Sequence, residues 1–117
     1  MNIRIEKINK YLRYWQIFLN LQAWKLNIKF KLFDRTDYPQ SGDIAVDNKN
    51  KKATIYLSKQ ETGKDNSIIL HELLHLILWK YDHFAEKFID NKNKDEYFII
   101  LEKTIADLEL IIYKKDK

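Results

Sequence analysis

The residues best suited to chemistry lie together in the segment 69–76, which reads ILHELLHL. Its two histidines, His71 and His75, are four residues apart, so on a helix they differ by about 40° and lie one turn apart on one side. Both imidazoles can therefore reach one ion. Glu72 is displaced from His71 by about 100°, which leaves its carboxylate beside that ion instead of in the ligand set. This HExxH arrangement predicts a zinc site with Glu72 as the catalytic base.

The chemistry expected of such a site is hydrolysis of an amide. Zinc polarises a bound water and lowers its pKa towards about 7, and Glu72 can accept the proton as the water attacks a carbonyl carbon. The apolar neighbours of the histidines, Leu73, Leu74 and residues 76–78, predict a dry surrounding that strengthens electrostatic effects. A pair of histidines that only hydrogen-bond within a buried helix is the alternative. Iron would also suit two histidines and a carboxylate, but the HExxH order favours zinc.

A third protein ligand is required downstream, because a catalytic zinc normally has three. The last predicted helix has an apolar stripe made of Phe98, Leu101, Ile105, Leu108 and Ile112. Glu102 borders this stripe, whereas Glu96 projects to the opposite side, so we select Glu102 as the third ligand. Glu109, two turns further along nearly the same face, could replace it or support it. The other candidates are Asp82, His83 and Glu86.

Peptide hydrolysis also needs a group that stabilises the oxyanion and a surface that aligns the substrate. Tyr81, His83 and Tyr113 are candidates for the oxyanion, and none is favoured over ordinary packing or surface roles. The strand at Gly42–Val46 is expected at the edge of a sheet, where it could align an extended peptide by main-chain hydrogen bonds.

Hydrophobic periodicity predicts an α+β domain in the order α-β-β-β-α-α. The expected elements are a helix from Ile5 to about Ala23, strands over Leu26–Leu32, Asp43–Val46 and Ala53–Leu57, a helix from Asn66 or Ser67 to about Tyr81, and a helix from about Asp95 to Tyr113. The second and third strands should form a hairpin, and loops are expected at 38–42, 47–51, 61–66 and 90–95.

Composition limits the class of protein. A chain of 117 residues, 45% of them hydrophobic, predicts a single domain over 1–117 with a core of its own. Cysteine is absent, so thiolate ligands are excluded and a cytoplasmic location is expected. Neither a secretion signal nor a membrane span is expected. The formal net charge of +4 is concentrated near the N-terminus, where a solvated helix face is favoured over nucleic-acid binding.

The segment His71-Glu72-Leu73-Leu74-His75, followed by a helix bearing Glu102, resembles the gluzincin metallopeptidases. In size and element order the chain looks like the minigluzincins, which have a minimal zincin-like scaffold of a helix, a three-stranded sheet, the HExxH helix and a glutamate helix. This resemblance implies one zinc ion, a glutamate third ligand, cleavage of peptides or unfolded proteins, and latency through a C-terminal segment or self-association. Residues 111–117 would be that segment, an idea that full activity after truncation at Leu110 would remove. The chain departs from the family in carrying Ala106 where a Glu-x-x-x-Asp signature would place its aspartate.

Other functions remain open from the sequence. A regulatory protease that cleaves one repressor or DNA-associated protein would explain the basic N-terminal helix and would bind DNA in a salt-sensitive way. A non-catalytic zinc-binding module would keep the metal without turnover, although Glu72 is dispensable for metal binding and is nevertheless present. A metal-free toxin-like or structural protein would contain no zinc, and chelators would not change its melting temperature.

Overall fold

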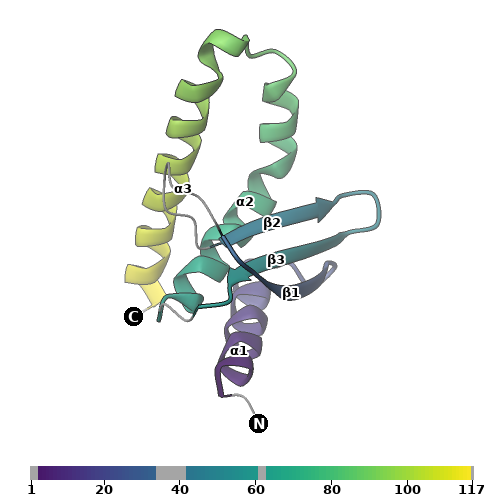
Figure 1. Ribbon diagram of the computed structural model, residues 1–117, viewed down its shortest axis with the longest axis vertical. Coiled ribbons are helices and arrows are strands. Elements are labelled where there is room, and N and C mark those ends of the chain that lie inside the picture. The colour runs from purple at the N-terminus through teal and green to yellow at the C-terminus, as the bar shows by residue number, and fades with distance from the viewer. Residues whose placement is uncertain (1–2, 34–41, 61–62, 117) are drawn as a thin grey trace. The chain divides into compact units, whose positions relative to one another are not determined.

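The computed structural model describes residues 3–33, 42–60 and 63–116 and has an α+β fold with three helices and a three-stranded mixed sheet (Figure 1). The elements are α1 (Ile3–Phe18), β1 (Lys25–Lys31), β2 (Gly42–Asp47), β3 (Lys52–Ser58), α2 (Asp65–Glu86), a 3₁₀ turn (Asn91–Asn93) and α3 (Lys94–Asp116). The predicted order is confirmed. The chain divides into two compact units, Met1–Leu73 and Leu74–Lys117, and the boundary falls inside α2. The single domain over 1–117 stays a prediction, and the expected loop at 38–42 lies outside the described residues except for Gly42.

The sheet of the first unit has the order β1-β3-β2. Strand β1 runs parallel to β3, and β2 pairs with β3 in the antiparallel direction, so the expected hairpin is confirmed and β2 lies at an edge. Every second residue of β3 is buried, namely Ala53, Ile55 and Leu57, as expected of a strand with one face towards a core. On the apolar face of β1, Leu26 and Ile28 are half-buried, whereas Phe30 is 36% exposed and Leu32, which follows the end of the strand, is 68% exposed.

Helix α1 ends at Phe18, and the prediction that it continues to Ala23 is wrong. Asn20 has a φ of 60°, the left-handed conformation that stops a helix. The amide of Asn20 donates to the carbonyl of Ile17 at 3.1 Å, and the amide of Leu21 donates to the carbonyl of Gln16 at 2.8 Å. These two bonds form a Schellman motif, which satisfies the last carbonyls of the helix.

The start of α2 is joined to α1 and β3 by the guanidinium of Arg4. Its Nε and Nη2 donate to the two carboxylate oxygens of Asp65, at 2.8 and 3.0 Å. Nη2 also donates to the carbonyl of Ser58, and Nη1 donates to the carbonyl of Lys59. The indole of Trp15, 1% exposed, donates to Asn66 Oδ1 at 2.6 Å. Helix α2 begins at Asp65, one or two residues before the predicted start at Asn66 or Ser67.

In the second unit the end of α2 and α3 run side by side in opposite directions (Figure 1). The hydroxyl of Tyr97 on α3 donates to Asp82 Oδ1 on α2 at 2.7 Å. Helix α2 continues to Glu86, beyond the predicted end at Tyr81, since no glycine or proline interrupts residues 81–86. Helix α3 extends to Asp116, so residues 111–116 of the hypothetical latency segment continue the helix.

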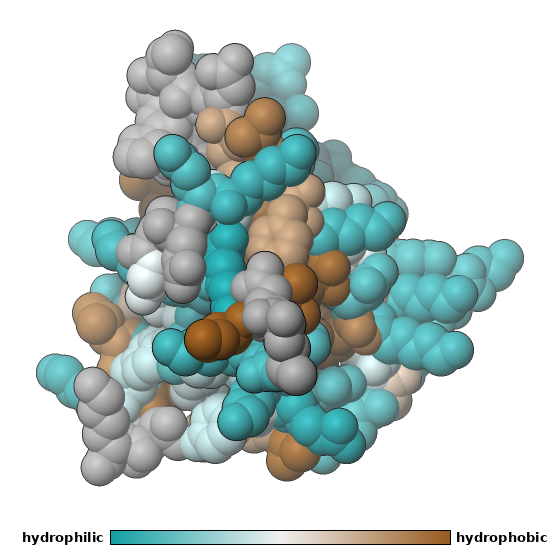
Figure 2. All heavy atoms as spheres, turned by 60° about the horizontal axis from the view of Figure 1, so that its bottom comes forward, coloured by the Kyte–Doolittle hydropathy of each residue, from teal (hydrophilic) through white to brown (hydrophobic). Residues whose placement is uncertain are grey.

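Exposure along the helices only partly follows the predicted stripes. On α3, Ile105 is fully buried, whereas Phe98 is 48% exposed, so its assignment to the core is wrong. Figure 2 shows a face on which hydrophilic side chains predominate and hydrophobic ones form smaller groups between them. Within the described part of the chain, no helix has the length and apolar character needed to cross a membrane.

Candidate metal centre

The two histidines of the HExxH segment lie on α2, within a stretch of the helix that is largely buried. His71 and His75 are half-buried, while Glu72 between them is only 6% exposed. The leucines at 70, 73, 74 and 76 are all buried, which confirms most of the predicted apolar surrounding. Ile77, however, is 42% exposed because it points away from this side of the helix. The two imidazoles therefore stay accessible between leucines that are buried.

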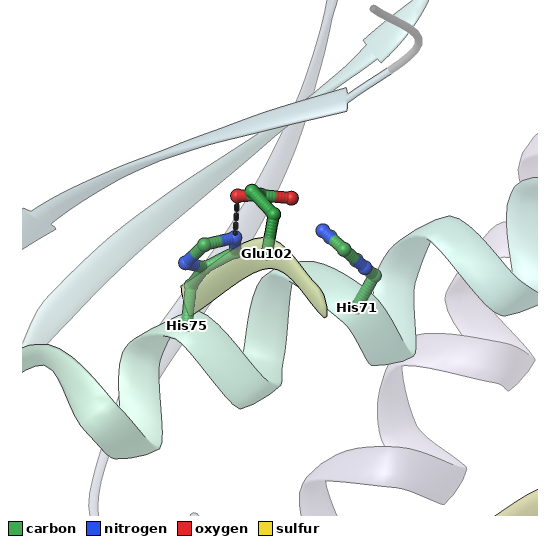
Figure 3. A group of neighbouring side chains, drawn as sticks. All are labelled: His71, His75 and Glu102. Carbon is green, nitrogen blue, oxygen red and sulfur yellow. Dashed lines mark ion pairs between the residues drawn. The ribbon is translucent and has the colours of Figure 1, made fainter. Parts of the chain in front are cut away.

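His75 meets a carboxylate from α3. Its Nε2 lies 2.8 Å from Oε1 of Glu102, and the two side chains are 19% and 34% exposed. The side chains of His71 and His75 point towards this carboxylate (Figure 3). Glu102 borders the buried Ile105 on α3, as the apolar stripe predicted.

One group of three potential ligands is present among the described residues, and it consists of His71, His75 and Glu102. One donor atom of each residue lies within 4.8 Å of the others. Donor atoms around a tetrahedral zinc with bonds of about 2.0–2.2 Å lie roughly 3.4 Å apart, so small side-chain movements would suffice to bind an ion. The residues selected from the sequence are the ones that the structure brings together, and they fit a metal site.

The alternative third ligands are placed differently. Asp82 accepts the hydrogen bond from Tyr97, and the ring of His83 stacks on Trp79 with centroids 4.7 Å apart. Glu86 and Glu96 are exposed, and Glu109 is half-buried. None of these side chains belongs to the group of three potential ligands found among residues 3–33, 42–60 and 63–116.

The oxyanion candidates stay predictions. Tyr81 is 77% exposed, His83 is exposed, and Tyr113 is half-buried near the end of α3. The substrate-aligning role of the strand at Gly42–Val46 is likewise a prediction, although that strand does lie at the sheet edge as β2.

Two contacts around the centre were missed by the sequence analysis. One is the hydrogen bond from Tyr97 to Asp82, which joins the two helices that carry His75 and Glu102. The other is the close approach of Gly42 to Glu72. A methyl group built at residue 42 would lie 3.1 Å from Oε2 of Glu72. The scarcity of glycine, with only two in the chain, was the one signal that could have drawn attention to residue 42.

The donor set itself limits what the centre can bind. Two neutral imidazoles and one carboxylate suit zinc or ferrous iron, and they leave coordination positions open for water or substrate. No known protein family model matches the chain, and no curated protein or solved structure matches it either.

Proposed function

We propose that this protein is a zinc-dependent endopeptidase. The observation that carries the proposal is the convergence of His71, His75 and Glu102 within 4.8 Å, with Glu72 following the first histidine on the same helix. The order of elements, from an N-terminal helix through a three-stranded sheet to the HExxH helix and a glutamate helix, supports a zincin-like scaffold of the minigluzincin type.

Each residue has a distinct role in the proposed reaction. His71, His75 and Glu102 would hold the ion. A bound zinc ion would act as a Lewis acid that lowers the pKa of water and polarises the substrate carbonyl. Glu72 would accept the proton of the attacking water and pass it to the departing amine. Its 6% exposure keeps competing solvent away from the carboxylate. The edge strand β2 would bind an extended peptide by main-chain hydrogen bonds.

The experiment that tests this proposal combines metal analysis with turnover. Wild-type protein, Glu72→Gln and Glu102→Gln are purified without chelator, their zinc and iron are measured by elemental analysis, and each is incubated with an unstructured protein such as casein. We expect one zinc per chain and casein cleavage for the wild type. Glu72→Gln should keep the zinc and lose cleavage, and Glu102→Gln should lose both.

Two glutamates on α3 provide matched controls. Glu96→Gln removes an exposed carboxylate from the same helix and should leave zinc content and cleavage unchanged. Glu109→Gln tests the competing third ligand, and loss of zinc in this variant but not in Glu102→Gln would move the assignment to Glu109. Zinc in the wild type without cleavage of any peptide would favour a non-catalytic binding module, and iron in place of zinc would contradict the proposal.

A further inference from the structure

Strand β2 begins unusually close to the side chains of α2. A methyl group added at Gly42 would lie 2.5 Å from Cγ2 of Ile68, 3.1 Å from Oε2 of Glu72 and 3.5 Å from Cγ of Glu72. The first distance is shorter than any ordinary carbon–carbon contact, so a residue with a side chain could not occupy this position without movement. Glycine is required at residue 42 because there is no space for a side chain. Its backbone is not in the left-handed conformation, which among the two glycines occurs at Gly63 with a φ of 75°.

The two neighbours differ in how easily they can move. Ile68 and Glu72 are four residues apart on α2, so both face the start of β2. Ile68 is β-branched, and in a helix such a side chain has essentially one χ1 rotamer, which prevents its Cγ2 from rotating away. The Glu72 carboxylate is at the end of a flexible side chain. A methyl group at residue 42 would therefore push the start of β2 away from Ile68, and it would also displace the Glu72 carboxylate.

We infer that Gly42 is a positioning residue, and that its missing side chain fixes where the Glu72 carboxylate lies. This inference rests on the proposed peptidase function, in which Glu72 accepts a proton. Proton transfer needs donor and acceptor within about 2.6–3.2 Å, so a displacement of tenths of an ångström changes its rate. Gly42 acts on the carboxylate and not on the metal ligands, so its loss should lower kcat without releasing the ion.

Turnover kinetics test the positioning role. Gly42→Ala should lower kcat about tenfold or more, with unchanged zinc content and little change in KM. The slow residual rate of a Glu72→Ala variant should fall no further when Gly42→Ala is added, because the carboxylate through which Gly42 acts is gone. Adding Ile68→Ala to Gly42→Ala should restore part of kcat, since the new methyl group could then fill the space that Ile68 leaves. An unchanged kcat in Gly42→Ala, or an equal loss in the Glu72→Ala background, would overturn the inference.

Gly63→Ala is the matched control, because nothing lies within 4 Å of a methyl group at residue 63 while its φ of 75° makes the substitution strained. It should lower stability and leave kcat unchanged, which separates general destabilisation from displacement of Glu72. An equal fall in kcat for the two alanine variants would count against Gly42.

A second measurement does not depend on activity. In urea unfolding, the effects of Gly42→Ala and Glu72→Ala should be non-additive by about threefold or more in the folding equilibrium constant, as expected of residues in contact. Additive effects would overturn the contact. Zinc-loaded wild type without turnover would instead overturn the proposed function, and a non-additive urea result would then still establish the contact alone.

Discussion

The two compact units differ in what stabilises them. The first, Met1–Leu73, contains most of the fully buried apolar side chains of the described chain. Its Arg4 guanidinium donates to the Asp65 carboxylate at the start of α2 and to the carbonyls of Ser58 and Lys59. In the second, Leu74–Lys117, the buried apolar side chains are Leu74, Leu76 and Ile105 among the described residues. Its two helices are joined by polar pairs, from Tyr97 to Asp82 and from His75 to Glu102.

This difference indicates that the two units depend on different interactions for their stability. Burial of apolar area is the main source of folding free energy, so the first unit has the larger share of it. The second unit leaves many large apolar side chains exposed, among them Tyr81, Phe84 and Phe88. One of its two polar pairs consists of two residues of the candidate metal centre, so we expect the stability of the second unit to depend on a bound ion more than that of the first.

The largest effect on stability is expected at Arg4. Arg4→Met removes the partner of Asp65, whose side chain is 9% exposed, and leaves that carboxylate nearly buried and uncompensated. Breaking such a pair costs roughly 3–5 kcal/mol, which urea unfolding at neutral pH would measure. Lys7→Met removes an exposed positive charge from the same helix and should change stability by less than about 0.5 kcal/mol. If Arg4→Met and Lys7→Met lowered the free energy of unfolding by similar small amounts, the Arg4 contacts would not be a main source of stability of the first unit.

The next effect is stabilisation by zinc. An ion bound only by the folded protein at 100 times its Kd should add about 2.7 kcal/mol to the free energy of unfolding. Glu72→Gln should keep this gain and Glu102→Gln should lose it, because only Glu102 belongs to the proposed ligand set. Amide hydrogen exchange would locate the gain, and we expect added protection in α3 above all. Added protection confined to the sheet of the first unit would contradict the comparison.

A smaller effect is expected from Tyr97, and it depends on pH. Burial, together with the hydrogen bond to Asp82 and the charge of that residue, raises the pKa of Tyr97 from 10.0 to about 12. The folded protein therefore keeps this proton between pH 10 and about 12 while the unfolded chain loses it, so the contribution of Tyr97 to stability is complete below pH 10 and falls as the pH rises through that window.

Tyr97→Phe should cost about 1–2 kcal/mol at neutral pH and should reduce the fall in stability at high pH. Phenolate absorbance of the folded wild type should show one tyrosine that titrates late, and the variant should lack it. Tyr81→Phe, at a side chain 77% exposed, is the control and should change neither quantity. Late titration that persists in Tyr97→Phe would assign it to another tyrosine.

The fold could be predicted to the level of element order, because the periodicity of apolar residues differs between helices and strands. The ends of elements were less predictable. Apolar residues at the expected spacing continue past Phe18, whereas a single left-handed residue, Asn20, ends α1. Phe98 fits the apolar stripe of α3 yet is exposed, since periodicity identifies a face of a helix and not how much of that face is covered.

The residues of the candidate centre could be predicted where they lie close together in the sequence. His71, Glu72 and His75 lie within one helical turn, so their spacing alone indicated their relation. The choice of Glu102 as third ligand followed from its position beside the apolar stripe of α3, because that stripe determines which side of α3 packs against α2. The approach of Gly42 to Glu72 joins residues 30 positions apart and depends on the path of β2, for which the sequence contains no periodic signal.

The smallest effect concerns the end of α1 in the first unit. Asn20→Ala should lower stability by about 1 kcal/mol, because alanine has a steric penalty at a φ of 60° that asparagine tolerates better. Asn20→Gly should stay within about 0.5 kcal/mol of the wild type, because glycine adopts this conformation without strain. Urea unfolding of both variants measures the difference, and hydrogen exchange at Leu21 reports on the Schellman motif directly. If Asn20→Ala cost more than Tyr97→Phe, the first unit would depend on its local polar contacts as strongly as the second does, and the contrast between the two would be lost.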